Sequence, residues 1–203
     1  MKVALIGASG NAGSRILAEL ARRGHAVTAI ARDPSKIAAG AHVTAVKADA
    51  DAPEALAKAI AGHDAVISSV HFAASDPRKL IAAVKAAGVP RYLVVGGAGS
   101  LEVAPGARLA DQPAFPAAYK AEALAGGVFL DLLKAEPTLN WTFLSPSALF
   151  TSGERTGKFR IGGDQLLTGA DGKSWISFED YAVALADELE KPAHERKRFT
   201  VGY

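Results

Sequence analysis

Three glycines near the start of the chain, Gly7, Gly10 and Gly13, have the spacing of a turn that cradles phosphate groups. An apolar run precedes them and a helical pattern follows, so the turn joins a strand to a helix, whose free N–H groups favour an anion. We expect the first glycine to turn the chain, the second to admit a pyrophosphate and the third to let the helix pack on the sheet. The alternative is a structural turn in a fold that has lost its ligand. The pattern predicts dinucleotide binding through Gly7, Ala8, Ser9, Gly10, Asn11, Ala12 and Gly13.

Charged residues follow the predicted strand 26–31, where the ribose of a dinucleotide is recognised. An NAD-selective site places a carboxylate there, and Asp33 stands at about the right distance. Asp33, however, precedes Pro34 and is better explained as a helix cap. Arg32 would bind a 2′-phosphate through paired hydrogen bonds, with Lys36 as a second cation. The sequence therefore favours NADP(H) over NAD(H), the alternative for Arg32 being a solvated surface arginine.

A tyrosine with a lysine four residues later would support carbonyl reduction, because the lysine lowers the pKa of the tyrosine. None of the four tyrosines has that partner: Tyr92, Tyr119, Tyr181 and Tyr203. Ketone reduction and sugar epimerisation are therefore disfavoured. A flavin or quinone accepts hydride at an electrophilic ring and can take its proton from water, so orientation is the main task of the protein.

Composition sets the limits of these interpretations. The chain has 203 residues, of which 49% are hydrophobic and 22% charged, with a net charge of +2, which predicts one globular domain without a nucleic-acid footprint. The absence of cysteine excludes disulfides and thiolate catalysis, and the five scattered histidines predict no metal site. No apolar stretch approaches the ~20 residues of a membrane span, and the first apolar run is needed as a strand rather than as a signal peptide. We expect a cytoplasmic protein.

Short apolar runs alternate with helical patterns along most of the chain. Their Val- and Ile-rich, non-alternating composition is typical of strands buried on both faces. The pattern predicts an α/β Rossmann fold, a doubly wound parallel sheet with helices on both faces. The predicted strands are 3–6, 26–31, 43–47, 65–69, 92–95, 141–145 and 199–201, and the predicted helices are 11–23, 53–61, 77–87, 116–135 and 178–191.

The alternation of apolar runs and helical patterns stops after the predicted strand 141–145. Residues 146–176 are rich in Gly, Ser and Thr, with strand-like pieces only at 158–161 and 166–168. We expect one domain over residues 1–203, with 146–176 forming most of a small substrate lobe near the C-terminus. Phe150, Arg155 and Phe159 would line its acceptor side, although a place in the lobe core is the alternative for the two phenylalanines.

Several segments are more specific than the glycines: Val94–Leu101, Trp141–Pro146, Gly153–Gly157 and Ile176–Ala182. With the glycine turn, they resemble the atypical short-chain dehydrogenase/reductases, in particular the bacterial NAD(P)H-flavin reductase-like proteins, which are related to biliverdin reductase B and the NmrA-like regulators. The resemblance covers essentially the whole chain. It implies a Rossmann domain, bound NAD(P)H and reduction of a flavin or quinone-like acceptor.

The resemblance also implies contacts at the ends of the later strands. Asp49, followed by Ala50, matches a position whose carboxylate binds the adenine amino group; the alternative is a helix-capping or loop aspartate. Ser68, Ser69 and Val70 are expected beside the ribose and nicotinamide, where small residues would also simply leave room. The remaining expected contacts are Gly97 beside the nicotinamide, and Pro146 and Ser147 near its amide.

Three residues are candidates for a chemical role. Tyr119 and Lys120, near the start of the predicted helix 116–135, are expected to face the nicotinamide, where Lys120 would hold a phosphate or stabilise a reduced anionic flavin. Ser100 would donate a hydrogen bond to the substrate. The alternatives are a surface pair on the helix and a loop-capping serine.

The first functional hypothesis is an NADPH-dependent oxidoreductase that reduces a small-molecule acceptor, either a free flavin (FMN or FAD) or a quinone-like compound. The second is a non-catalytic redox sensor of the NmrA-like type, which binds NADP(H) and signals to a protein partner. The third is an isomerase or carbonyl reductase with non-standard acid–base residues. The sequence leaves a homo-oligomer open.

Overall fold

The apolar runs form one eight-stranded sheet in the computed structural model, which describes residues 1–203. The strand order is β10-β12-β8-β5-β4-β1-β2-β3, and all neighbours run parallel except β10 and β12. In the register, Val3 pairs with Val27 on one side and with Ala65 on the other. The strands are β1 (Lys2–Ile6), β2 (Ala26–Ala31), β3 (Val43–Lys47), β4 (Ala65–Ser68), β5 (Tyr92–Val95), β8 (Trp141–Ser145), β10 (Arg160–Gly162) and β12 (Lys197–Gly202).

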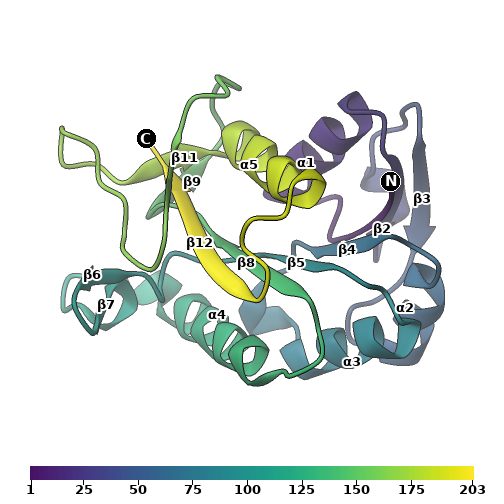
Figure 1. The fold of residues 1–203 in the computed structure, drawn as a ribbon, viewed down its shortest axis with the longest axis horizontal. Coiled ribbons are helices and arrows are strands. Elements are labelled where there is room, and N and C mark those ends of the chain that lie inside the picture. Colours follow the sequence, from purple (N-terminus) through teal and green to yellow (C-terminus); the bar gives the residue numbers. More distant parts are fainter.

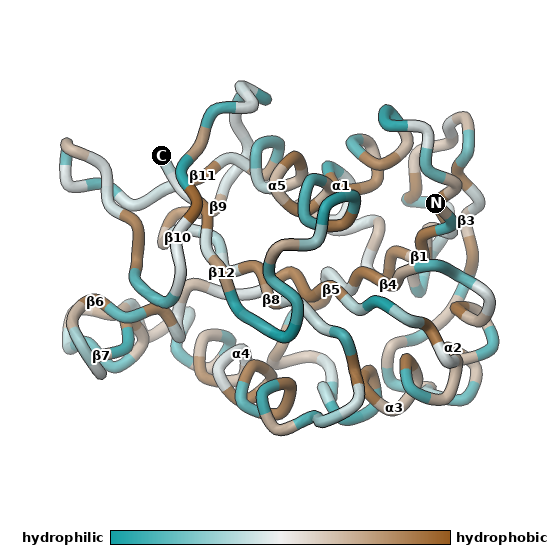
Figure 2. Tube along the Cα trace, in the orientation of Figure 1, coloured by the Kyte–Doolittle hydropathy of each residue, from teal (hydrophilic) through white to brown (hydrophobic).

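Helices cover both faces of this sheet, which confirms the predicted Rossmann architecture (Figure 1). Alternate residues of a strand point to opposite faces of the sheet. In β1, Val3 and Leu5 pack against the two helices on one face, and Ala4 and Ile6 pack against the three helices on the other. The hydrophobic colouring accordingly follows the central strands (Figure 2). One face carries α1 (Asn11–Arg22) and α5 (Phe178–Glu190), and the other carries α2 (Pro53–Ile60), α3 (Pro77–Ala87) and α4 (Ala117–Ala135).

The signals for helix starts and ends act as expected. Asp33 caps the short 3₁₀ helix η1 (Pro34–Lys36), and Asp76 caps α3 by accepting a hydrogen bond from the Arg78 N–H at 2.9 Å. Ser177 caps α5, accepting from the Asp180 N–H at 3.0 Å. The glycines after the helices, Gly24, Gly62 and Gly88, all have positive φ. None of the helices is long and apolar enough to cross a membrane.

The region after β5 differs from the predicted one. A hairpin of β6 (Glu102–Ala104) and β7 (Ala107–Arg108) and a parallel pair of β9 (Leu149–Thr151) and β11 (Trp175–Ser177) form two small sheets that the sequence did not predict. The strand expected at 158–161 is β10, which joins the main sheet as its antiparallel edge. The strand expected at 166–168 is wrong: only Gln165 makes a bridge, to Glu102, through the hydrogen bonds from the Glu102 N–H to the Asp164 carbonyl and from the Leu166 N–H to the Glu102 carbonyl. Two further 3₁₀ helices are η2 (Phe72–Ala74) and η3 (Leu109–Asp111).

Residues 153–157 are fastened to the α1–α5 face. Arg155 donates two hydrogen bonds to the buried Glu19 of α1, at 2.9 and 3.0 Å, and the Gly157 N–H donates to Asp180 at 2.8 Å. Burial raises the pKa of Glu19, but hydrogen bonds from Arg155, Arg22 and Arg23 outweigh burial and hold the pKa far below its usual range. Arg155 therefore attaches the lobe to α1, and its guanidinium is not free to line the acceptor side.

This ion pair predicts a pH-dependent stability. In the Glu19→Gln variant we expect about 1–3 kcal/mol less stability near neutral pH, because hydrogen bonds to a charged group are lost. The folded-state pKa of Glu19 is lowered, so its contribution is present above the unfolded value of about 4.3 and is lost as the pH falls below it. Urea unfolding of both proteins across the acid range measures this convergence. The exposed Glu54→Gln variant is the control, and a gap between wild type and Glu19→Gln that persists in acid would contradict the assignment.

Candidate active site

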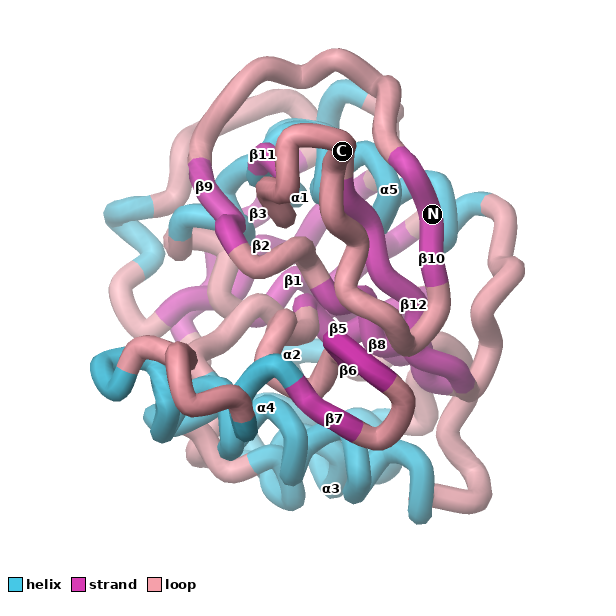
Figure 3. Tube along the Cα trace, turned by 90° about the vertical axis from the view of Figure 1, so that its left-hand side faces the viewer, coloured by secondary structure: helices cyan, strands magenta, loops and turns pink.

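The carboxyl ends of the parallel strands form the candidate site. The strand order reverses between β1 and β4, and ligands of open α/β sheets bind at such a reversal. Figure 3 shows this edge toward the viewer. There β9 and β11 lie on one side of the ends of β5 and β8, and β6, β7 and α4 lie on the other.

The glycine turn has the geometry that its spacing predicts. Gly7 has φ +81°, and a Cβ there would stand 2.0 Å from the Ser69 carbonyl oxygen. A Cβ on Gly13 would stand 2.1 Å from the Gly7 oxygen, so both glycines are required by close packing. Gly10 differs: it is exposed, and its added Cβ would meet only the Gly7 oxygen, at 3.4 Å. The space over Gly10 is therefore open to a ligand.

The first turn of α1 provides donors to that space. Gly10 is its N-cap without a side-chain cap, and Ser14 makes the first internal hydrogen bond, at 2.8 Å to the Gly10 oxygen. The N–H groups of Asn11, Ala12 and Gly13 have no partner in the protein. Such a set of donors, with the helix dipole, suits a pyrophosphate.

The charged residues after β2 differ in whether their side chains are bound by other groups of the protein. Asp33 accepts hydrogen bonds from the Ser35 hydroxyl at 2.6 Å and from its N–H at 3.2 Å, and these bonds lower the pKa of Asp33. Lys36 lies 3.8 Å from the same carboxylate. Arg32 is exposed and makes no ion pair or hydrogen bond in the protein. The carboxylate is thus occupied and the guanidinium is free.

Asp49 follows β3, next to β2 in the sheet, with Ala31 paired to Lys47. Its Oδ1 accepts the Asp51 N–H at 3.0 Å within the loop before α2, whose N-cap is Ala52, and the other carboxylate oxygen has no partner in the protein. The neighbouring Ala50 is half-buried against the core. Both remain predictions as adenine contacts.

The loop after β4 touches the glycine turn. The Ser69 N–H donates to the Ile6 carbonyl at 2.8 Å. A Cβ added at Gly7 would stand 3.4 Å from Val70 Cγ1, so Val70 also lies against the glycine turn. Ser68 is buried, and its hydroxyl shares a 2.9 Å hydrogen bond with the Tyr92 hydroxyl. Burial raises the pKa of Tyr92 far above its usual range, so this pair stays neutral. Contact of Ser68 with a cofactor would therefore use its backbone.

The three catalytic candidates, Tyr119, Lys120 and Ser100, differ in exposure and in hydrogen bonding. The Lys120 ammonium donates to the Ala110 carbonyl, and Tyr119 is 67% exposed. Ser100 is buried, and its hydroxyl has no hydrogen-bond partner in the protein. Gly97, on the same loop, faces the ring of Phe72, 3.3 Å from its added Cβ. Catalytic roles for these residues stay predictions, and Lys120 would first have to leave Ala110.

The residues after β8 point inward. Pro146 is buried, and the Ser147 hydroxyl donates to the Val201 carbonyl at 2.9 Å, so it is used within the fold. Phe150 packs against Phe178 and Tyr181, with ring centroids 4.5 and 4.7 Å apart, and has the lobe-core role.

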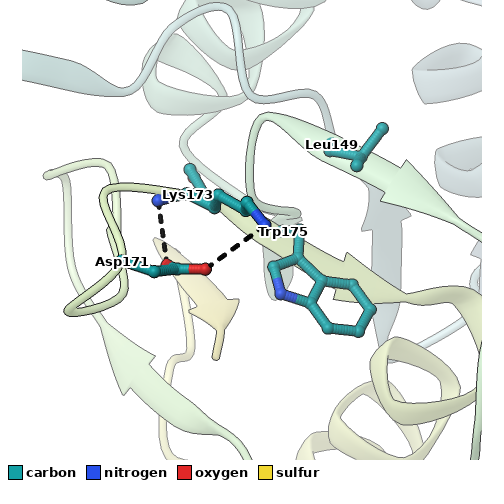
Figure 4. A pocket seen from close by; sticks show the side chains of 5 residues that line it. Leu149, Asp171, Lys173 and Trp175 are labelled. Carbon is teal, nitrogen blue, oxygen red and sulfur yellow. Dashed lines mark hydrogen bonds and ion pairs between the residues drawn. The ribbon is translucent and has the colours of Figure 1, made fainter.

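The lobe carries a hollow of about 560 Å³ (Figure 4). Leu149 and Trp175, paired across β9 and β11, form its apolar part, and Trp175 packs on the Tyr203 ring at 4.3 Å. Asp171 and Lys173 form an ion pair of 3.7 Å at its rim. The lining is therefore mixed, with two hydrophobic residues beside Asp171, Lys173 and Ser174.

One residue at the candidate site was missed in the sequence. Glu122 of α4 accepts hydrogen bonds from the N–H groups of Phe72 and Ala73, each at 2.8 Å, and thereby fixes the segment after β4. No local signal marks Glu122, because its partners lie about fifty positions earlier. No group of three or more His, Cys, Asp or Glu side chains is arranged to hold a metal ion.

Comparisons with known proteins support a nicotinamide cofactor through a family model and the description of one relative. Residues 7–192 match the model of a family described as NAD(P)H-binding. A Burkholderia pseudomallei structure, provisionally described as an exported protein, is 46% identical with a TM-score of 0.91, covering 100% of both chains. A Bacteroides thetaiotaomicron structure, provisionally an epimerase, is 43% identical with a TM-score of 0.95, covering 100% of this chain and 96% of its own. A Streptococcus pneumoniae structure, provisionally an NADH-flavin reductase, is 40% identical with a TM-score of 0.85, covering 100% and 99%.

Proposed function

We propose that this chain, which belongs to the NAD(P)H-binding family, is an oxidoreductase that passes hydride from NADPH to a flavin or quinone-like acceptor. The observation that carries the cofactor assignment is the open space over Gly10, beside three N–H groups of α1 without partners. The residues present therefore fit a dinucleotide. When bound, the cofactor would supply the hydride, and the protein would supply position and shielding from water.

The preference for NADPH rests on the two charges after β2. Asp33 is engaged by Ser35, whereas Arg32 is exposed and without a partner. A guanidinium binds a phosphate through two parallel hydrogen bonds, which a ribose hydroxyl cannot replace.

Replacing Arg32 by alanine tests that preference. We expect the Kd for NADPH to rise about 10–150-fold, because charge-assisted hydrogen bonds to the 2′-phosphate contribute about 1.5–3 kcal/mol, while the Kd for NADH barely changes. Titration of both cofactors by nicotinamide fluorescence gives both values. Lys134→Ala, at an exposed position in the last turn of α4, is the charge-matched control. Equal losses for the two cofactors would contradict a role at the 2′-phosphate.

The choice of acceptor is supported by what the chain lacks and by one relative. No tyrosine is followed four residues later by lysine, and Lys120 is bound to the Ala110 carbonyl, which disfavours carbonyl chemistry. The Streptococcus pneumoniae relative, 40% identical to this chain, is provisionally an NADH-flavin reductase. The Bacteroides relative is provisionally an epimerase, so the two descriptions differ.

Steady-state oxidation of NADPH tests the proposed function, with FMN, FAD and menadione as acceptors and NADH in parallel. Saturable turnover with NADPH preferred is the expected result. Tight NADP(H) binding that depends on redox state, without turnover, would instead favour the sensor hypothesis. A cytoplasmic location is proposed together with this activity, because NADPH is held there; the Burkholderia relative is provisionally an exported protein, and cell fractionation decides between the two.

A further inference from the structure

The histidines are distributed unequally between the two edges of the sheet. His25, His42, His63 and His194 all precede the parallel strands β2, β3, β4 and β12, which places them toward the amino edge. His71 alone follows a strand, three residues after the end of β4, at the edge where ligands bind. Histidine is the side chain best suited to exchange a proton near neutral pH.

The position of His71 is fixed by three loops. Ser69, two residues earlier, contacts Gly7 of the glycine turn, and Phe72, one residue later, contacts Gly97 of the loop after β5. His71 therefore stands where the ends of β1, β4 and β5 meet. Its side chain is 88% exposed, so the ring is accessible from solvent at this edge.

A fixed carboxylate faces this ring. Glu122 Oε1 lies 3.5 Å from His71 Nδ1, and the same carboxylate is held by the N–H groups of Phe72 and Ala73. This contact is an ion-pair distance rather than a hydrogen bond; it places the carboxylate on the Nδ1 side of the imidazole and leaves Nε2 to exchange a proton with another molecule.

Other charges near His71 are few. The glycine turn and residues 96–100 contain no charged side chain. On α4, the Lys120 ammonium is bound to the Ala110 carbonyl, and Tyr119 is exposed. On the segment of His71 itself, Asp76 accepts the Arg78 N–H. Glu122 is therefore the charged partner that faces the ring.

We propose that His71, oriented by Glu122, is the proton donor to the acceptor, an inference that rests on the proposed function. The hydride of NADPH adds to the acceptor with its electron pair, so the nicotinamide is oxidised and the acceptor reduced. The Nε2–H bond of the His71 imidazolium breaks, and its proton forms an O–H or N–H bond on the acceptor. The neutral imidazole then regains a proton from water. This assignment requires acceptors whose reduced form carries a new proton on oxygen or nitrogen, a class that includes quinones and also carbonyl compounds.

The test compares His71→Asn with His42→Asn in single-turnover oxidation of NADPH by menadione. His42 lies at the opposite edge, and its φ of 64° suits asparagine, so this control keeps its fold. We expect the rate of His71→Asn to fall about 100-fold, the usual minimum for general acid catalysis. We also expect the wild-type rate to decline with rising pH and to show a solvent deuterium effect. Both should vanish in His71→Asn and persist in His42→Asn.

A second readout is independent of turnover. Diethyl pyrocarbonate modifies exposed imidazoles, and mass spectrometry locates the modified histidine. We expect NADP⁺ with menadione to protect His71 and to leave His42 reactive. Glu122→Gln, which keeps an oxygen for the Phe72 N–H, should slow turnover without changing the Kd for NADPH.

The outcomes separate this inference from the proposed function. Normal turnover and an unchanged pH profile in His71→Asn, or an unprotected His71, would overturn the role of His71 and leave the reductase standing. If the wild-type protein fails to oxidise NADPH in the presence of any of the acceptors, both the role of His71 and the proposed reductase function are overturned.

Discussion

Replacing Gly10 by alanine is expected to raise the Kd for NADPH about 100-fold, which corresponds to about 2.7 kcal/mol, without unfolding the protein. Gly10 has φ −75° and ψ 171°, which any residue adopts. Its added Cβ would make an ordinary contact with the Gly7 oxygen at 3.4 Å and otherwise occupy the open space over the α1 N–H groups. The methyl group therefore meets the pyrophosphate and not the protein. Fluorescence titration with NADPH and thermal unfolding of the ligand-free protein measure the two effects.

Substitutions of two further glycines are controls for the effect of Gly10→Ala on NADPH binding and on stability. Gly40→Ala should change neither quantity, because its Cβ would stand 3.6 Å from Val43 at an exposed position. Gly13→Ala should damage both, because its Cβ would stand 2.1 Å from the Gly7 oxygen, which is backbone and cannot move cheaply. If Gly10→Ala binds NADPH as wild type does, the cofactor does not lie over this turn.

The largest loss of stability is expected from Glu188→Ala, about 3–5 kcal/mol. Glu188 is buried at the amino edge, where it pairs with Arg91 at 2.9 Å and accepts the His194 N–H at 2.9 Å. Burial lowers the pKa of Arg91 and the charge of Glu188 opposes that effect, so removing the carboxylate leaves a buried cation without its partner. This pair joins α5 to the residue just before β5. The loss is a large part of a typical total of about 5–15 kcal/mol.

Urea unfolding measures this loss against Asp171→Ala, whose exposed ion pair with Lys173 is expected to contribute about 0–1 kcal/mol. Folded Glu188→Ala should bind NADPH with the wild-type Kd, because the network lies at the edge opposite the candidate site. A loss below about 1 kcal/mol would mean that Arg91 finds other partners.

The sequence was a good guide wherever the signal is local. Apolar runs without alternation predicted the seven parallel strands, and Asp33, Asp76 and Ser177 marked helix starts because a cap acts within three residues. The roles of the three glycines follow from backbone sterics alone, and the added-Cβ distances for Gly7 and Gly13 agree with them. These features require no knowledge of distant residues.

The rest depends on partners that are remote in the chain. Arg155 was expected beside the acceptor but binds Glu19. Ser147 stays a prediction as a contact of the nicotinamide amide, although its hydroxyl donates to the Val201 carbonyl. Lys120 and Ser68 likewise bind groups that no local pattern identifies. The small sheets of β6 with β7 and of β9 with β11 contain strands of two or three residues, too short for a periodic signal. The structure of residues 146–176 therefore depends on long-range pairing, which the sequence does not reveal, whereas the glycine turn depends on local residue types, which it does.

The most direct test of the account is an anaerobic single turnover in which the protein–NADPH complex is mixed with FMN or menadione and both partners are followed by absorbance. We predict that the nicotinamide is oxidised and the acceptor reduced at one common rate, which saturates with acceptor concentration. A complex that holds NADPH and leaves its absorbance unchanged with every acceptor would contradict hydride transfer and leave only a binding protein.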